Sequence, residues 1–250
     1  MPAWYDSRAA AGFSGTEVGL TQGASAGIVP PAPREEKPVK YLRLLSLVFV
    51  TLPVVALPQT VNINSDLLLA ARKGSEATVL ALLDQGASVN SRNRLGDTPL
   101  LIAAKNGYTS MGLKLIERGA DVNIRNLAGV SPLMAAAFEG NPQLVQSLLA
   151  RRADLAATDR VRKTAMVYAA GSGHFEIVRA LLDAGVDVNA RYENELTALM
   201  WAAAYGHDRA VTLLLERGAD VNARDNRGKT AAVMAEEGGH HATLKLLRHP

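Results

Sequence analysis

One small pattern of residues returns every 33 positions through the second half of this 250-residue chain. The recurring residues are a threonine or serine, at Thr98, Ser131, Thr164, Thr197 and Thr230, and a glycine, at Gly74, Gly107, Gly140, Gly173, Gly206 and Gly239. A fixed period of this length is typical of stacked repeats, in which each unit packs only against its neighbours. Such proteins generally work by presenting a surface rather than by enclosing a pocket.

Each unit of the pattern predicts two short helices. In the fourth unit, Thr164 is a good N-cap for a helix over the alanine-rich stretch 165–170. A second helix is expected after Gly173, because apolar residues then recur at helical spacing, at Ile177, Val178, Leu181 and Leu182. A single unit of about 33 residues cannot bury enough apolar surface to fold alone, so stability must come from stacking.

The stretches GDTPL at 96–100 and GADVN at 218–222 are close to two motifs of the ankyrin repeat, and the chain resembles that family. The resemblance implies an all-α solenoid of about six helix-turn-helix units with short β-hairpin fingers. The repeats are expected at about 62–92, 93–125, 126–158, 159–191, 192–224 and 225–250, within an ankyrin-repeat domain spanning 62–250.

The sequence departs from the family pattern at three glycine positions. Arg152 stands where the second helix of the third unit would end in glycine, while Arg162 and Glu195 replace the finger-tip glycines of the fourth and fifth units. Each substitution predicts a residue with a β-carbon in a backbone conformation that favours glycine. The histidine that the family places after T-P-L is replaced by apolar residues, at Leu101, Met134, Val167, Met200 and Val233.

The first sixty residues differ in character from the repeats. Residues 1–38 are rich in Gly, Ala, Ser and Pro, which predicts disorder or a segment that is not translated. Residues 39–56 combine a positive flank, an apolar run and small residues near Ala56, as a secretory signal peptide does. Translation starting at Val39 would place this leader at the N-terminus. The alternative is an uncleaved apolar segment, and the run is too short for a stable membrane span.

Composition and motifs give no support for catalysis. The chain has no cysteine, and its 27 basic and 24 acidic residues are interspersed rather than gathered in a stripe that would bind nucleic acid. His174, His207 and His240 recur at the repeat period, but equivalent residues on packed helices lie about 8–10 Å apart, too far to share a zinc ion. We expect them to have a structural role at the start of the second helix. The prediction is a protein without catalytic residues, metal or cofactor.

The resemblance places a partner-binding surface on the finger tips and on the exposed ends of the first helices. Carried over by register, this surface comprises Arg92, Arg94, Lys105, Asn106, Arg125, Leu127, Val130, Phe138, Glu139, Arg160, Lys163, Arg191, Asn194, Tyr205, Arg224 and Arg227. Four of these arginines share one register position and form a ladder interrupted at Thr158. Either they anchor a partner, or they pair with the hairpin aspartates at Asp121, Asp154, Asp187 and Asp220.

The sequence therefore predicts a monomeric module that binds another protein in the periplasm or outside the cell. The resemblance extends to bacterial periplasmic ankyrin proteins, among which both stress-related proteins and toxin-immunity partners occur. The alternative is an effector delivered to a host cell, in which case the apolar segment would not be cleaved. Anchorage in the inner membrane and a cytoplasmic location also remain open.

Overall fold

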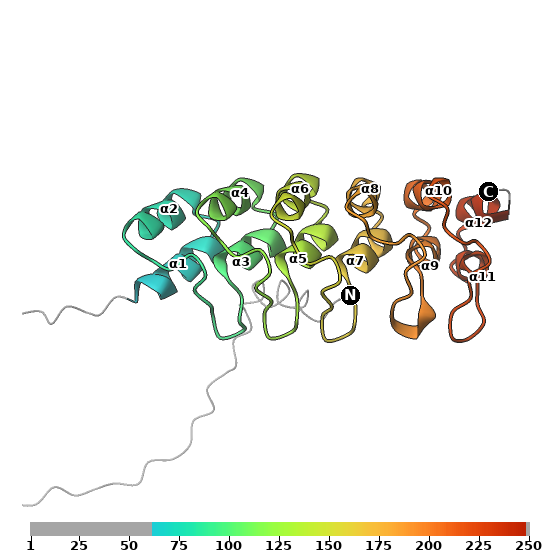
Figure 1. Ribbon diagram of the computed structural model, residues 1–250, viewed down its shortest axis with the longest axis horizontal. Coiled ribbons are helices and arrows are strands. Elements are labelled where there is room, and N and C mark those ends of the chain that lie inside the picture. The colour runs from blue at the N-terminus through green and yellow to red at the C-terminus, as the bar shows by residue number, and fades with distance from the viewer. Residues whose placement is uncertain (1–61, 249–250) are drawn as a thin grey trace, which may run out of the picture. The chain divides into compact units, whose positions relative to one another are not determined.

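Six helical hairpins follow one another in single file in the computed structural model, which describes residues 62–248 (Figure 1). Within this range the α-helices are α1 (Ile63–Arg72), α2 (Glu76–Asp84), α3 (Pro99–Lys105), α4 (Thr109–Glu117), α5 (Pro132–Glu139), α6 (Pro142–Ala150), α7 (Ala165–Gly171), α8 (Phe175–Asp183), α9 (Ala198–Ala204), α10 (Asp208–Glu216), α11 (Ala231–Glu237) and α12 (His241–Arg248). The predicted segments 1–38 and 39–56 lie outside the described residues.

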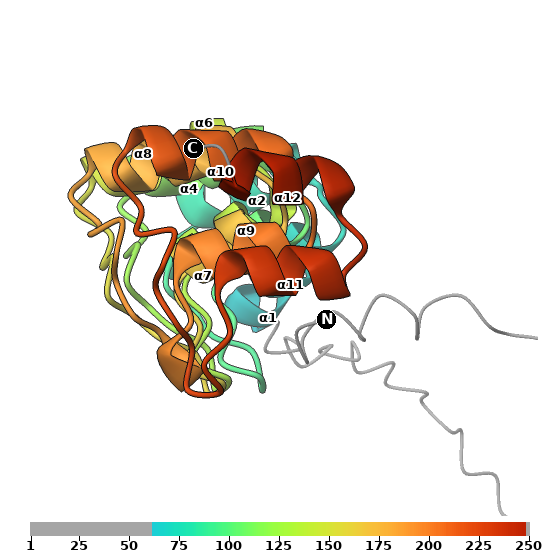
Figure 2. The same cartoon turned by 90° about the vertical axis from the view of Figure 1, so that its right-hand side faces the viewer.

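The helices are arranged in two rows (Figure 2). The odd-numbered helices form an inner row and the even-numbered helices an outer row, and each inner helix packs against the next inner helix and against the outer helix that follows it. The loops between repeats project together from one side of the inner row. We call them fingers and number each by the repeat that it begins, so that they run from the second finger to the sixth. The predicted all-α solenoid is confirmed.

The inner helices begin where the sequence pattern predicts. The side-chain oxygens of Thr98, Ser131, Thr164, Thr197 and Thr230 each accept a hydrogen bond from the backbone N–H three residues later, at 3.2–3.4 Å. Pro99 and Pro132 occupy the first helical position, where a missing N–H costs nothing. One hydroxyl per repeat thus fixes the start of each inner helix after the first.

Two rows of equivalent residues form the core. Ala103, Ala136, Ala169, Ala202 and Ala235 lie one repeat apart on the inner helices, and all are completely buried. Their small size lets neighbouring inner helices approach closely. Between the two rows of helices, the corresponding residues of α4, α6, α8 and α10 are Leu115, Leu148, Leu181 and Leu214, which are also completely buried.

The fingers are turns rather than paired strands. Residues 62–248 contain no β-strand, so the expected β-hairpins are not formed. Instead, in four fingers a side-chain oxygen of Asn93, Asn126, Asp159 or Asp225 accepts hydrogen bonds from the backbone two and four residues later, at 2.8–3.0 Å. These local bonds satisfy the finger backbone without a strand ladder.

The three substituted glycine positions have the backbone conformation that their register predicts. Arg152, Arg162 and Glu195 have φ angles of 59°, 57° and 62°. Asn194, at φ 60°, is a fourth such residue that the sequence did not predict. It lies beside Glu195 in a short 3₁₀ helix, η2 (Glu193–Glu195), which is the tip of the fifth finger. A residue with a β-carbon is strained in this region.

The recurring histidines connect successive repeats. The Nε2 atoms of His174, His207 and His240 donate to the carbonyl oxygens of Phe138, Gly171 and Ala204, each 36 residues earlier, at 3.0–3.2 Å. His174 and His207 also stand immediately before α8 and α10. The predicted structural role at the start of the second helix is therefore correct.

Candidate functional site

The arginines at the shared register position tie each finger to the next. The Arg92 guanidinium donates to the Arg125 carbonyl, Arg125 donates to the Thr158 carbonyl at 3.5 Å, and Arg191 donates to the Arg224 carbonyl at 3.0 Å. Arg224, in the last finger, turns back to the Gly228 carbonyl at 2.8 Å. The ladder thus bonds to finger backbone rather than to the hairpin aspartates, while its guanidinium groups stay exposed.

The tips of the second, third and fourth fingers expose both apolar and cationic side chains. Leu95, Leu127 and Val161 are 60%, 61% and 58% exposed. Arg94 and Arg160 are exposed and make no side-chain hydrogen bond or ion pair within residues 62–248. These five residues, which we call the tip strip, combine apolar area with free guanidinium groups, a composition common at interface centres.

An aromatic cluster lies on the inner helices beneath the fourth finger. The Lys163 ammonium is 4.7 Å from the centroid of the Trp201 ring and 5.7 Å from that of Tyr168. Phe138 packs edge-on against Tyr168, with ring centroids 5.8 Å apart, and Tyr205 stacks on Trp201 at 6.2 Å. Tyr205 remains 55% exposed, so it adds aromatic area to the accessible surface.

Lys105 belongs to a polar network rather than to the free surface. Its ammonium is 3.1 Å from the carboxylate of Asp97, and the side chains are 15% and 7% exposed. Asp97 also accepts a hydrogen bond from the Asn126 side chain of the next finger at 2.9 Å. Lys105 therefore connects an inner helix to two fingers.

The remaining predicted residues are buried, half-buried or bonded to other groups of the protein. Val130 is 1% exposed, so it is not available to a partner. Its backbone N–H and carbonyl are both bonded to Asn126, and the chain turns inward here as the finger returns to α5. Asn106 donates to the Ile102 carbonyl of its own helix at 2.8 Å. Asn194 accepts from the Asn226 side chain at 3.2 Å, Arg227 pairs with Asp225 at 2.9 Å, and Glu139 is half-buried.

One carboxyl group and one phenol in the fingers, those of Asp225 and Tyr192, have shifted pKa values. Burial by itself would raise the pKa of Asp225, but hydrogen bonds from the Lys229 backbone and the Arg227 side chain outweigh it and hold this pKa below its usual value. Burial raises the pKa of Tyr192 to about 12, against a smaller opposing effect of the Thr164 side chain, so the phenol stays protonated near neutral pH.

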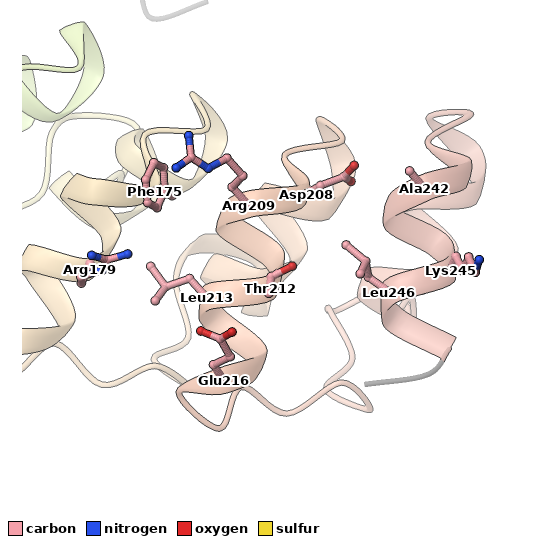
Figure 3. Close-up of a pocket in the computed structure, with 10 residues that line it drawn as sticks. All are labelled: Phe175, Arg179, Asp208, Arg209, Thr212, Leu213, Glu216, Ala242, Lys245 and Leu246. Atoms are coloured by element: carbon pink, nitrogen blue, oxygen red, sulfur yellow. The ribbon is translucent and has the colours of Figure 1, made fainter.

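A shallow groove of about 770 Å³ lies on the outer row, between α8, α10 and α12 (Figure 3). In it, the Arg209 guanidinium lies 3.7 Å from the centroid of the Phe175 ring. Leu213 and Leu246 contribute apolar lining, and Glu216 and Lys245 stand at its edge. This groove is on the opposite row from the tip strip.

Within residues 62–248, no group of three or more side chains is placed to hold a metal ion. In the same range, no helix combines the length and apolar character needed to span a membrane.

Sequence reasoning missed the residues between the fourth and fifth fingers, of which Tyr192 is the most informative. Tyr192 stands in the register of Asn93, Asn126, Asp159 and Asp225, whose side chains close the other fingers. The register itself carries this signal, because a phenol cannot accept the two backbone hydrogen bonds that an Asn or Asp side group accepts there.

The geometry defines a class of protein: a solenoid of stacked helical hairpins that presents a row of fingers as its accessible surface. Within that class, the chain belongs to the ankyrin-repeat family, because a family model described as ankyrin repeats (3 copies) matches residues 61–126, 111–192, 133–225 and 190–250. It is similar to the crystal structure of EF0377, an ankyrin repeat protein, with 32% sequence identity and a TM-score of 0.67. The similarity covers 74% of this chain and 98% of that one. No curated protein matches the chain.

Proposed function

We propose that this chain is a periplasmic protein-binding module that captures its partner with the tip strip and the exposed aromatic surface around Tyr205. The repeat fold is that of a protein–protein interaction scaffold. The observation that carries the proposal is that the guanidinium groups of Arg94 and Arg160 make no bond within residues 62–248 and lie beside three exposed aliphatic side chains. Most other finger arginines instead donate to backbone carbonyls of the fingers.

The fingers give this surface the rigidity that a binding site needs. Hydrogen bonds between the second, third and fourth fingers hold the tip strip at fixed spacing, so little conformational entropy is lost when a partner binds. Arginine side chains and aromatic rings contribute strongly at interface centres, and Tyr205 supplies a ring that is 55% exposed. A rigid surface of this composition supports capture of another protein.

Affinity capture from periplasmic extract tests the binding surface. The tagged full-length protein is compared with Arg94→Glu/Arg160→Glu and with Arg151→Glu/Lys245→Glu, a control that changes the net charge equally at exposed residues away from the fingers. We expect the tip-strip variant to lose at least nine-tenths of a protein that the wild type and the control capture. Equal capture by all three, with unchanged helical circular dichroism, would place the binding surface elsewhere.

Cell fractionation tests the proposed location. Export predicts a processed protein in the periplasm whose N-terminal sequence begins just after Ala56. A periplasmic protein that retains Trp4 or Tyr5 would contradict cleavage of the leader. An unprocessed protein in the medium or in a host cell would instead favour a delivered effector.

A further inference from the structure

The junction between the fourth and fifth fingers lacks a side-chain bond that other junctions have. The Oδ1 atoms of Asn90, Asn123 and Asn189 accept hydrogen bonds from the backbone N–H groups of Asp121, Asp154 and Asp220, at 2.8–2.9 Å. Ala156 occupies this register in the third repeat and has no side-chain acceptor. The Asp187 N–H therefore has no such partner.

The arginine ladder stops at the same junction. Thr158 stands in the register of Arg92, Arg125 and Arg191, and its short hydroxyl-bearing group does not reach the next finger. The Arg191 carbonyl oxygen thus lacks the guanidinium donor that the carbonyls of Arg125, Thr158 and Arg224 each have.

A backbone hydrogen bond is missing here as well. Adjacent fingers are joined at three junctions by Leu127 N–H to Leu95 C=O, Arg160 N–H to Ala128 C=O, and Asn226 N–H to Asn194 C=O, at 2.9–3.0 Å. The equivalent pair is Glu193 N–H and Val161 C=O, and no hydrogen bond joins them within the described residues. The fifth finger is therefore tied to the sixth but not to the fourth by these bonds.

Two substitutions coincide at this junction and at no other. At Gly96 and Gly129, an added β-carbon would lie 3.0 Å from the backbone of the following finger, so close stacking favours glycine there. Arg162 brings a β-carbon to the same register. On the other side of the junction, Tyr192 places a phenol where other fingers have a short Asn or Asp.

The space between the two fingers is a pocket of about 600 Å³. Leu155, Ala156 and Val186 contribute apolar lining. The hydroxyl of Tyr192 is buried there beside the Thr164 side chain, and its proton has no acceptor among the described residues. Since the phenol titrates only near pH 12, it is available as a hydrogen-bond donor.

Carboxylates outnumber cations around the pocket, because Asp187, Glu193 and Glu195 line it together with Arg162 and Arg191. The Arg162 guanidinium is 2.6 Å from the Glu193 carboxylate, and Arg191 lies 3.4 Å from that of Glu195. Each arginine at the pocket has a carboxylate beside it, and the Asp187 carboxylate forms no salt bridge among the described residues, so an acidic ligand is disfavoured. Besides that carboxylate, the pocket offers hydrogen-bonding groups of the backbone and the phenol of Tyr192.

We propose that an extended segment of the partner protein without acidic side chains enters this pocket and supplies the missing hydrogen bonds between the fourth and fifth fingers. A backbone carbonyl of the segment accepts from Glu193 N–H, and a backbone N–H of the segment donates to the Val161 carbonyl, as in recognition by strand addition. A neutral acceptor, such as a side-chain amide oxygen, accepts from the Tyr192 hydroxyl. The proposal rests on the proposed function, because it names the part of the partner that this face recognises.

The test uses a phage-displayed library of random linear decapeptides selected on the immobilised full-length protein. The comparison protein is Ala156→Asn/Thr158→Arg/Arg162→Gly, in which the missing side chains and the glycine are restored so that the pocket closes. We expect selected peptides, made synthetically, to bind this variant at least tenfold more weakly than wild type, although the variant melts at a higher temperature. Tyr192→Phe is expected to weaken binding several-fold.

Hydrogen exchange on the wild-type protein provides a readout that needs no variant. The amide of Glu193 is expected to exchange at least tenfold more slowly when a selected peptide is bound, while that of Asn226, already paired, changes little. An unprotected Glu193 amide, equal binding to the restored variant, or no enriched peptide would each overturn the proposal. If the tip-strip variant loses partner capture while the restored variant keeps it, the proposed function stands and this inference fails.

Discussion

His207 lies directly against Gly173 of the preceding repeat. Its Nε2 donates to the Gly171 carbonyl oxygen at 3.0 Å, and a β-carbon added to Gly173 would stand 2.5 Å from its Nδ1. The glycine also has a φ of 75°, which a residue with a β-carbon rarely adopts. Glycine at this position therefore allows the left-handed turn of its own repeat and leaves room for the histidine of the next repeat.

Gly173→Ala should lower the free energy of unfolding by about 2–3 kcal/mol, because backbone strain adds to displacement of a hydrogen-bonded imidazole. Gly107→Ala is the matched control, since Gly107 has the same register and a φ of 70° but no atom within 4 Å of an added β-carbon. It should cost about 1–2 kcal/mol. Urea denaturation measures both, and equal losses would show that the imidazole contact contributes nothing.

Replacing Arg152 with glycine should stabilise the protein. Arg152 ends the second helix of the third repeat at φ 59°, and its backbone hydrogen bond to Leu149 does not depend on its side chain. Relief of left-handed strain exceeds the extra entropy of glycine in the unfolded state, so we expect a gain of up to about 1 kcal/mol. Thermal denaturation followed by circular dichroism checks this, and a lower melting temperature would be the contrary result.

The sequence predicts the solenoid because each repeat carries its own helix signals. Thr164 caps its helix and Arg152 takes a left-handed φ as their registers require, and both are local consequences of sequence. The contacts between fingers are not local. Arg92 reaches a carbonyl 33 residues away, and Val130 turns inward because its backbone is bound within the finger. Such outcomes depend on the spacing of stacked turns, which no single repeat specifies.

The junction between the fourth and fifth fingers also could not be predicted from the sequence of any one repeat. Thr158 was visible as a gap in the arginine register, but its meaning requires the positions of Ala156, Arg162 and Tyr192 relative to one another. Each departure is tolerable in one repeat. Together they separate two fingers, and only the arrangement in space shows that all four face the same junction.

Stability at acid pH should depend on Asp225. Hydrogen bonds hold its pKa below the usual value in the folded protein, so the carboxylate stabilises the folded state above about pH 4, the usual pKa of an aspartate. This contribution is lost as the pH falls through the lowered folded-state pKa. Asp225→Asn should therefore be less stable than wild type at pH 7, with a smaller difference at pH 3. Urea denaturation at both values measures it, and a difference independent of pH would contradict the assignment.

Arg92 and Arg94 allow the structural and binding roles of finger arginines to be separated. Arg92 donates to the Gly96 carbonyl at 3.3 Å and to the Arg125 carbonyl of the next finger, whereas Arg94, two residues along, makes no side-chain bond within residues 62–248. Arg92→Ala should therefore lower the free energy of unfolding by about 0.5–1.5 kcal/mol. Arg94→Ala should change it by less than about 0.5 kcal/mol, as exposed residues without such bonds do. Urea denaturation of the two variants decides between these roles, because equal effects would mean that the ladder does not hold the fingers together.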